Sequence, residues 1–520
     1  MPIRLHAHFQ SLIFAAYILA ACGPVSCVQV QPEPQHPWSS GVLTKYPIQP
    51  IIKPAIDVPT ATEHVILKSP SPQINDQFGA SIALTLNTLV VGAPNTTGGG
   101  AAWIFDLENS NAPPIQLVPQ HLESTDAFGT SVAISDSGRF IAVGSPKAQV
   151  GEKKNVGMIH VWEKKVNQWS FVGTFTNPDL AANAKLGSTV AIGDDTLLAG
   201  APFEPLFIES VVKSVTQPVV ERIEIKTVHA HGVVLTWMRD SDGKWNENIT
   251  LQPDPGIHGA QFGGALSLKG TQLIVGAPTA RASEQSEAGK CYIFLRRAKG
   301  WPYEPLVSIS QIGNKAFKGD ENNISGNGPD HHFGWAVTIL GTVALSGTPE
   351  DSDGNFIKSG SVNIFQRANT TWIQTQYISA PDKRSDDAFG SSVGIAGTHF
   401  VIGAPLKSFN NISRVGAVYV YQFSQTKPDE EDFMIKLLPS IPQKNSSFGA
   451  ALSCTPDIIA ISAPSATDPS QPGLIYIFKR TEMSWGVPGS TMSSDAPLET
   501  SASISPNPVA AAKTSEIPPQ

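Results

Sequence analysis

The chain has 520 residues and a formal net charge of −8, with 41% hydrophobic and only 15% charged residues. Glycine (44) and proline (42) are abundant, which is typical of a turn-rich all-β protein. The acidic balance argues against a basic nucleic-acid-binding protein, so we expect no nucleic-acid partner.

Residues 1–21 are predicted to be a signal peptide. Arg4 precedes the apolar run Leu12–Ala21, which is too short to remain in a bilayer as a spanning helix. The run is followed by Cys22 and Gly23, and it resembles the lipobox of bacterial lipoproteins. That resemblance implies acylation of Cys22 and, because Gly23 follows, an outer-membrane location. An ordinary signal peptide cut nearby is the alternative.

Three further segments are predicted from composition and repetition. Residues 22–62 are rich in Pro, Gln and Ser and are predicted to be an extended tether. Residues 63–486 carry a repeated pattern and form the folded domain. Residues 487–520 are rich in Ser, Pro and Ala and are predicted to be a disordered tail.

The repeated pattern has three anchors at fixed spacing, each present seven times. The first is Phe-Gly, with one Leu-Gly variant. The second is Gly-Ala-Pro or a close variant, which follows the first by 14 residues in six copies and by 16 in the other. The third is a Gly five residues before an aromatic residue. The first anchors begin at Phe78, Phe128, Leu186, Phe262, Phe333, Phe389 and Phe448, and the third begin at Gly100, Gly157, Gly232, Gly289, Gly360, Gly416 and Gly473.

Each copy predicts three or four short strands. After each Phe-Gly, bulky and small residues alternate, which is the period of a strand. The Pro of the second anchor lacks a backbone donor and ends the second strand. A fourth strand is marked in most copies by a tryptophan: Trp169, Trp245, Trp301 or Trp372. Such units pack either around an axis as the blades of a β-propeller or as a linear solenoid.

Ring closure distinguishes these two architectures. The seventh copy lacks a proper fourth strand, whereas an orphan strand precedes the first Phe-Gly. We therefore predict that residues 63–68 complete the last blade. Closure of this kind joins both chain ends and removes a sheet edge, so the predicted fold is an all-β, seven-bladed propeller closed by an N-terminal strand.

The anchors resemble FG-GAP repeats, the units of the seven-bladed propeller of integrin alpha chains, which also occur in bacterial surface proteins. In that family several blades carry an Asp-rich calcium loop between the first two strands. Here these turns are short, and even Ser135–Gly138 supplies too few oxygens for Ca²⁺. We therefore expect no cofactor at these turns. Asp351, Asp353 and Asn355, in a partial acidic loop, are the remaining metal candidates, and a solvated Asp/Gly turn is the alternative.

Trp335 stands two residues after its Phe, where the other six copies have small residues. Beside Asp330, His331 and His332, it is predicted either to stack on a ligand near the axis or to plug the channel as packing. Asp126 and Asp387 are interpreted as turn-capping carboxylates. Cys291 and Cys454 are interpreted as small buried hydrophobic residues rather than a disulfide.

No nucleophile elbow, phosphate loop or HExxH motif is present. The leading hypothesis is therefore a non-enzymatic, membrane-anchored, surface-exposed binding or adhesion module. Its long loops, Phe203–Ala230 and Gln311–His332, would meet a protein or glycan partner on one face. The alternative is a hydrolase or lyase that uses residues near the axis, with Asp330, His331, His332 and Asp351 as its candidates. A third hypothesis is a structural envelope component.

Overall fold

The computed structural model describes residues 59–488, apart from residues 110, 167, 214–220, 229–230, 254–258, 281–288, 299, 304, 310–331, 370, 424–431, 465–471 and 482–483. The chain divides into two units at residue 53, and the described residues all belong to the second unit. Among them, no helix is long and apolar enough to cross a membrane.

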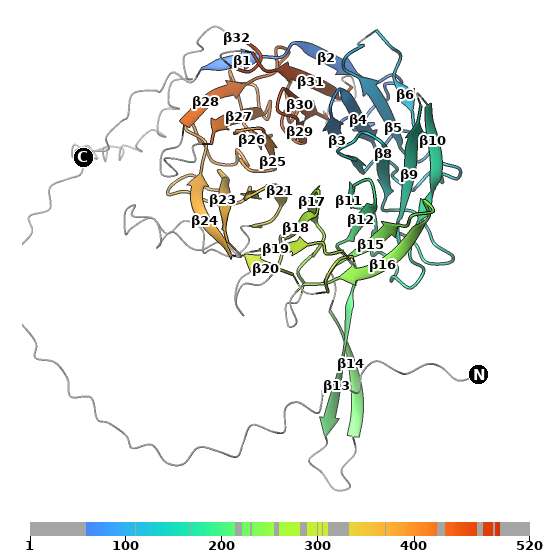
Figure 1. Cartoon of the computed structure of the whole chain (residues 1–520). Helices are drawn as coiled ribbons and strands as arrows, with labels where there is room; N and C mark the ends of the chain where they lie inside the picture. The colour runs from blue at the N-terminus through green and yellow to red at the C-terminus, as the bar shows by residue number, and fades with distance from the viewer. Residues whose placement is uncertain are drawn as a thin grey trace, which may run out of the picture. The chain divides into compact units, whose positions relative to one another are not determined.

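Seven antiparallel blades of four strands form a ring (Figure 1). Six blades are separate four-stranded sheets, and the sheet of blade 6 contains two further strands. Each blade has an inner strand beside the axis, then a second, a third and an outer strand. Blade 1 contains β3 (Ser81–Thr85), β4 (Thr88–Ala93), β5 (Ala101–Asp106) and β6 (Ile115–Gln116); blade 2 contains β7 (Ser131–Ile134), β8 (Phe140–Ser145), β9 (Met158–Lys165) and β10 (Gln168–Phe175); blade 3 contains β11 (Thr189–Ile192), β12 (Thr196–Ala201), β15 (Val233–Arg239) and β16 (Trp245–Leu251).

The remaining four blades repeat this order. Blade 4 contains β17 (Ala265–Lys269), β18 (Gln272–Ala277), β19 (Lys290–Leu295) and β20 (Val307–Ile309); blade 5 contains β21 (Ala336–Leu340), β22 (Val343–Thr348), β23 (Ser361–Ala368) and β24 (Thr371–Ile378); blade 6 contains β25 (Ser392–Ala396), β26 (His399–Ala404), β27 (Ala417–Gln422) and β28 (Asp432–Leu437); blade 7 contains β29 (Leu452–Cys454), β30 (Ile458–Ala463), β31 (Leu474–Lys479) and β2 (Val65–Lys68).

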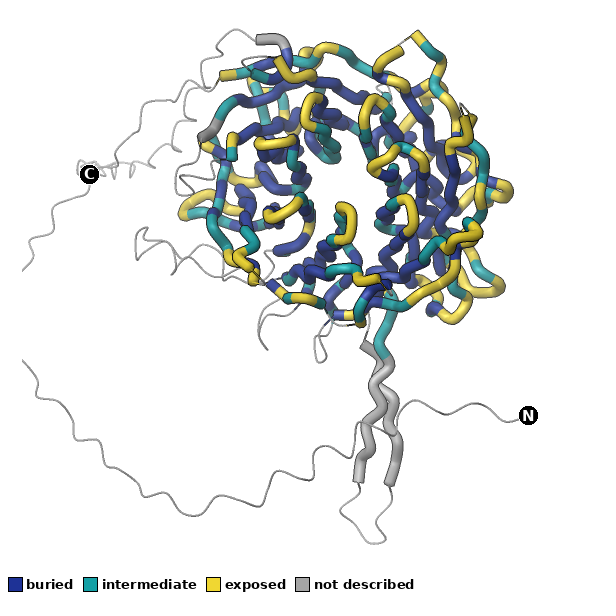
Figure 2. Tube along the Cα trace, viewed as in Figure 1, coloured by how far each residue is buried: buried dark blue, intermediate teal, exposed yellow. Residues whose placement is uncertain are grey.

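Burial follows the position of a strand in its blade. The second strands of blades 2, 3, 5, 6 and 7 are buried along their whole length, because each lies between an inner and a third strand and between two neighbouring blades. The outer strand β10 is mostly exposed or half-buried. Figure 2 shows the same gradient, with buried residues in the strands and exposed residues at the turns. The core is therefore a ring of packed layers between the blades.

The first anchor supplies the aromatic part of this core. All six anchor Phe side chains, and Leu186 in the seventh copy, are completely buried. Each Phe ring packs edge-to-face on aromatic rings of the third strand of its own blade, with ring centroids 5.2 to 6.3 Å apart. Such pairs contribute about 0.5–1.5 kcal/mol beyond their buried area. One aromatic contact between the first and third anchors is thus repeated in the six blades that carry an anchor Phe.

The glycines of the second and third anchors explain how neighbouring blades meet. A Cβ atom added to the Gly of the second anchor would lie 2.0 to 2.3 Å from the Phe-Gly glycine carbonyl of the next blade, at six junctions. A Cβ added to the Gly of the third anchor would lie 2.0 to 2.3 Å from the carbonyl oxygen of the next anchor Phe or Leu186, at all seven. Only glycine permits this approach of two backbones.

Four junctions carry a hydroxyl clamp in addition. A Ser or Thr three residues after the anchor donates a hydrogen bond to the Phe-Gly glycine carbonyl of the next blade. The clamps are Ser81 to Gly129 (2.9 Å), Ser131 to Gly187 (2.7 Å), Thr189 to Gly263 (2.6 Å) and Ser392 to Gly449 (2.7 Å). The other three blades have Ala at this position, namely Ala265, Ala336 and Ala451.

The N-terminal end of the described chain closes the ring. β2 pairs antiparallel with β31 and is the outer strand of blade 7. On the other side of blade 7, a Cβ on Gly473 would lie 2.1 Å from the carbonyl oxygen of Phe78 in blade 1. The prediction that residues 63–68 complete the last blade is confirmed, and the solenoid is excluded.

A second clasp was not predicted. β1 (Thr60–Thr62) pairs in parallel with β28 of blade 6 and antiparallel with β32 (Val487–Pro488). The tail predicted to begin at residue 487 thus starts with two residues paired to the N-terminal segment, and residues 489–520 lie outside the described part. The two chain ends are joined in blade 6 as well as through blade 7.

The inserted loops differ from the repeat in two places. β13 (Leu206–Lys213) and β14 (Glu221–Val228) form a two-stranded antiparallel sheet of their own, inserted between β12 and β15 of blade 3. The predicted outer strand at Trp301 begins later, at Val307. Trp301 is instead buried in the preceding loop, where its indole Nε1 donates to Thr196 Oγ1 of blade 3 at 3.0 Å.

Candidate functional site

Two surfaces follow from the topology. The loops after the second strands and the loops before the inner strands open on one side of the ring, which we call the loop face. The turns between inner and second strands and those between third and outer strands open on the other side, which we call the turn face. Trp335, His332 and Asp351 lie in or beside the loops of the loop face, and the axial pocket opens toward the turn face.

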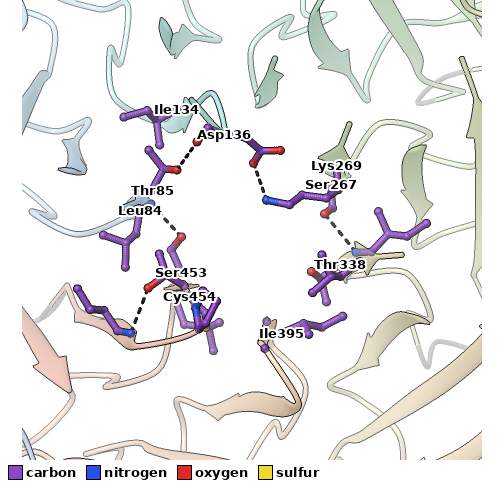
Figure 3. Close-up of a pocket in the computed structure, with 18 of the residues that line it drawn as sticks. Leu84, Thr85, Ile134, Asp136, Ser267, Lys269, Thr338, Ile395, Ser453 and Cys454 are labelled. Carbon is purple, nitrogen blue, oxygen red and sulfur yellow. Dashed lines mark hydrogen bonds and ion pairs between the residues drawn. The ribbon is translucent and has the colours of Figure 1, made fainter. Parts of the chain in front are cut away.

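The axial pocket lies among the inner strands and has a volume of about 840 Å³ (Figure 3). Its walls are aliphatic side chains from inner strands, including Leu84, Ile134, Leu268, Ile339 and Ile395. Small polar residues also line the pocket. In three blades, the residue between the two bulky residues of the inner strand is polar, namely Ser267, Thr338 and Ser453. The alternation of bulky and small residues predicted for the inner strands is therefore present in this pocket.

Hydroxyl groups in the pocket join neighbouring inner strands. Ser453 Oγ accepts a hydrogen bond from the backbone amide of Leu84 at 2.9 Å, across the junction of blades 7 and 1. Ser267 Oγ accepts from the amide of Ile339 at 3.3 Å, across the junction of blades 4 and 5. Inner strands lie at the end of each sheet, so these side chains replace a missing strand partner.

The charged residues that line the pocket are Asp136, Lys269 and Asp457. The Lys269 Nζ donates to Asp136 Oδ1 at 2.6 Å, and Figure 3 shows the lysine reaching toward Asp136 across the upper edge of the pocket. This pair joins blade 4 to blade 2, past blade 3. Both side chains are about half exposed (45% and 59%), so the pair is accessible to solvent at the mouth.

Cys454 also lines the pocket, which the sequence did not indicate. Burial raises the pKa of its thiol to about 12, so the thiolate is scarce at neutral pH and the side chain is not an activated nucleophile. Cys291 is fully buried; burial raises the pKa of its thiol to about 12 as well, and the Sγ donates to Ser346 Oγ at 3.4 Å. Both cysteines are free, as predicted.

Trp335 and His332 are brought together on the loop face. The Trp335 side chain is 49% exposed, and its amide donates to the His332 carbonyl at 3.0 Å. The two rings are tilted, with centroids 5.9 Å apart, and His332 Nδ1 lies 3.5 Å from Glu350 Oε1. Trp335 is not among the pocket-lining residues, so it neither plugs nor lines the axial pocket. Asp330 and His331 lie outside the described residues.

The partial acidic loop of blade 5 is bound by the protein itself. Asp351 is buried, and its Oδ2 accepts hydrogen bonds from Ser361 Oγ (2.6 Å) and Tyr377 OH (2.8 Å). Asp353 Oδ2 pairs with the ammonium of Lys383. Asn355 is exposed. Among the described residues, no group of three or more His, Cys, Asp or Glu side chains gathers as a metal site. Donors of the protein itself therefore bind the carboxylates of Asp351 and Asp353.

Blade 6 contains a buried charge cluster that sequence reasoning missed. Lys407 Nζ donates to Asp387 Oδ2 and to the Asp382 carbonyl, both at 2.7 Å. Lys436 Nζ donates to Asp382 Oδ2 at 2.7 Å, and Tyr419 OH donates to Asp382 Oδ1. Burial favours a raised pKa for Asp382, but the two lysines outweigh it and hold that pKa well below its usual range. The only sequence signal is a lysine within the apolar strand β28.

Asp387 and Asp126 confirm the turn-capping interpretation. Asp387 Oδ2 accepts from the amide of Arg384 at 2.8 Å, and Asp126 Oδ2 accepts from the amide of Glu123 at 2.9 Å. Burial raises the pKa of both carboxyl groups. Asp387 differs because Lys407 pairs with it, and this second role was not predicted.

Seven four-stranded blades closed by a strand from the N-terminal end define the chain as a seven-bladed β-propeller. A family model of the FG-GAP repeat matches residues 245–294 and 372–421, so the propeller contains FG-GAP repeats in these two segments. Each matched segment runs from the outer strand of one blade through the first three strands of the next. This offset of one strand explains why the first copy begins with β2, which then completes blade 7.

No curated protein matches the sequence. Among solved structures, a protein assigned as a 6-phosphogluconolactonase from Bacteroides uniformis ATCC 8492 aligns at 12% identity with a TM-score of 0.46, over 76% of this chain and 93% of its own. Sqt1 from Chaetomium thermophilum aligns at 11% identity with a TM-score of 0.43, over 82% of this chain and 99% of its own. Neither similarity bears on the activity of this chain.

Proposed function

We propose that the chain is a membrane-anchored, surface-exposed binding or adhesion module that presents its loop face to a protein or glycan partner. Cys22 would carry the lipid anchor of an outer-membrane lipoprotein. The tether that begins at residue 22 would end before β1 (Thr60–Thr62), which is part of the propeller, and would hold the propeller away from the bilayer. An FG-GAP propeller fits a binding module, because its blades provide a rigid frame and its loops are free to vary.

The distribution of exposed hydrophobic side chains supports the choice of face. Of the 14 large hydrophobic residues that are exposed in the described part of the chain, seven lie in loops of the loop face, whereas the turn face carries four, namely Leu86, Val166, Tyr303 and Leu306. Exposed apolar groups gathered on one face mark an interaction surface. The loop-face residues are Ile74, Val118, Phe203, Trp335, Phe356, Ile357 and Ile441.

Trp335 is the observation that carries the proposal. Its six equivalents are small, yet this position holds a large aromatic side chain that remains 49% exposed. Packing therefore does not account for its size. His332 contacts one side of the indole and restricts its orientation, and Glu350 adds a carboxylate beside His332. An oriented aromatic face next to polar groups is suited to stacking on a sugar ring or to anchoring an apolar side chain of a protein.

The test compares two exposed aromatic residues on opposite faces. Trp335→Ala should weaken partner capture in cross-linking pull-downs from the native membrane and in glycan-array binding, whereas Tyr303→Ala on the turn face should not. Tyr303 is 74% exposed, so it is the matched control. Equal capture by wild type and Trp335→Ala would refute the assignment of the face. Equal loss with both variants would indicate non-specific adhesion and also refute it.

Two further variants test the remaining parts of the proposal. Deletion of residues 204–229 removes the β13–β14 hairpin without touching a four-stranded blade, so the propeller should fold and partner capture should weaken. Cys22→Ser should move the protein from the membrane fraction to the soluble fraction. Retention of the Cys22→Ser variant in the membrane fraction would contradict the lipid anchor.

A further inference from the structure

We propose that the axial pocket is a binding site for a linear aliphatic di- or polyamine. This site is separate from the loop face, because the pocket is lined by inner strands and by the turns that follow them. The proposal therefore stands independently of the proposed function. Three features of the pocket carry it: the internal lysine that already spans its mouth, the balance of charge in its lining, and its aliphatic walls.

Lys269 shows which chemistry the pocket accommodates. Its side chain is a four-carbon aliphatic stem that ends in an ammonium group, and the ammonium binds Asp136 Oδ1 at 2.6 Å across blade 3. An aliphatic amine from solvent has the same stem and the same head group. Because both side chains are about half exposed, their ion pair is weak in water and can be exchanged for another ammonium at little cost.

The charge of the lining favours a cation. The described lining contains two carboxylates, Asp136 and Asp457, and one ammonium, that of Lys269, so its formal charge is −1. A ligand with two or more ammonium groups can meet two carboxylates at once, which a monoamine cannot.

The walls are suited to the methylene segments of such a ligand. Leu84, Ile134, Leu268, Ile339 and Ile395 line the pocket from five inner strands. Ser267, Thr338 and Ser453 also line the pocket, and their hydroxyl oxygens are hydrogen-bond acceptors between the aliphatic side chains. Alternating aliphatic surface and hydrogen-bond acceptors match the alternating methylene and ammonium groups of a polyamine.

Leu86 is a further feature of the mouth of the pocket. It is 67% exposed and adopts a φ of 47°, whereas the equivalent turns of blades 4, 5 and 6 place Gly270, Gly341 and Gly397 there at φ 58° to 62°. A leucine in this left-handed conformation is strained and is not needed for the turn. Its exposed side chain extends the aliphatic surface at the rim of the pocket.

The experiment is a calorimetric titration of the full chain with spermidine. Wild type should bind saturably with one site per chain. Asp136→Asn and Asp457→Asn should each weaken binding by about three- to fivefold, which is the contribution of one exposed ion pair. Lys269→Met keeps the stem but removes the competing cation, so it should strengthen binding by a similar factor. Lys165→Met removes an exposed lysine that pairs with Glu163 outside the pocket and should change nothing.

Two other probes separate the proposed chemistry from plain charge and plain hydrophobicity. Magnesium chloride should not displace spermidine at equal charge concentration, and octanoate should not bind. The proposal would be overturned if spermidine did not bind saturably, if magnesium displaced it, or if octanoate bound more tightly. It would also be overturned if Asp457→Asn and the distant Glu247→Gln weakened binding equally. Thermal melts of every variant distinguish a loss of the site from a loss of the fold.

Discussion

Substitution of Gly92 by Ala tests the reason for the second anchor. The added Cβ would lie 2.1 Å from the carbonyl oxygen of Gly129 in blade 2 and 2.5 Å from Ser81 Oγ. The two blades must then separate by about 1 Å to restore ordinary contact, and overpacking of this kind typically costs about 1–3 kcal/mol. Gly92 does not adopt a positive φ, so the effect is one of contact and not of backbone conformation.

The same movement would break the hydroxyl clamp of this junction. Ser81 Oγ donates to the Gly129 carbonyl at 2.9 Å, and a hydrogen bond of this kind contributes about 1 kcal/mol. A Gly→Ala change also stabilises the native state by about 0.4–1 kcal/mol through the unfolded chain. The net expected loss of the free energy of unfolding is about 1–3 kcal/mol.

The measurement is urea denaturation of wild type and Gly92→Ala, followed by fluorescence. Ser462→Ala is the matched control, because the seventh copy already carries a Cβ at the equivalent position, 3.1 Å from a Cβ built on Gly79. That variant loses only the hydrogen bond from the amide of Ala451, at about 1 kcal/mol. If Gly92→Ala is as stable as wild type, or if Ser462→Ala loses more stability than Gly92→Ala, the close approach of the two backbones is not the reason for glycine at the second anchor.

Three other outcomes follow from the structure. Burial lowers the pKa of His160 to about 4, whereas the unfolded chain takes up this proton near pH 6.5. The free energy of unfolding should therefore fall by about 3 kcal/mol as the pH drops from 6.5 to 4. His160→Gln should show a smaller difference between melts at pH 7 and pH 4 than wild type. Lys407→Met leaves the buried Asp387 carboxylate without its ammonium partner and should lower the free energy of unfolding by about 3–5 kcal/mol. Adding Asp387→Asn to this variant removes the unpaired charge and should restore part of the loss; no recovery would contradict the role of the pair. Deletion of residues 59–68 removes both β1 and β2, so limited proteolysis should cut blades 6 and 7 first, and a uniform digestion pattern would contradict closure by these strands.

The anchors predict most of the fold because each one corresponds to a short-range requirement. The Phe-Gly glycines adopt φ values of +86° to +92°, the Pro ends the second strand, and alternation of bulky and small residues defines the inner strand. These requirements repeat at fixed spacing, so they can be recognised without knowing any contact between blades. The orphan strand at 63–68 could likewise be assigned by counting, since one copy lacked an outer strand.

The candidate sites were harder to predict, because they depend on which loops meet. Trp335 could be singled out, since it departs from six equivalents. Cys454, Lys269 and Asp136 carry no such signal, because ordinary strand and turn residues line the axial pocket when six inner strands are brought together.

The sequence by itself determined the number of blades, the strands within them and the strand that closes the ring, since all of these follow from local periodicity and chain order. Only the tertiary structure decided that the Lys407 cluster is buried, that β32 returns to pair with β1, and that Lys269 reaches Asp136 across the axial pocket. These contacts join residues from 20 to more than 400 positions apart, and their formation depends on the curvature of the closed ring, which no local pattern encodes.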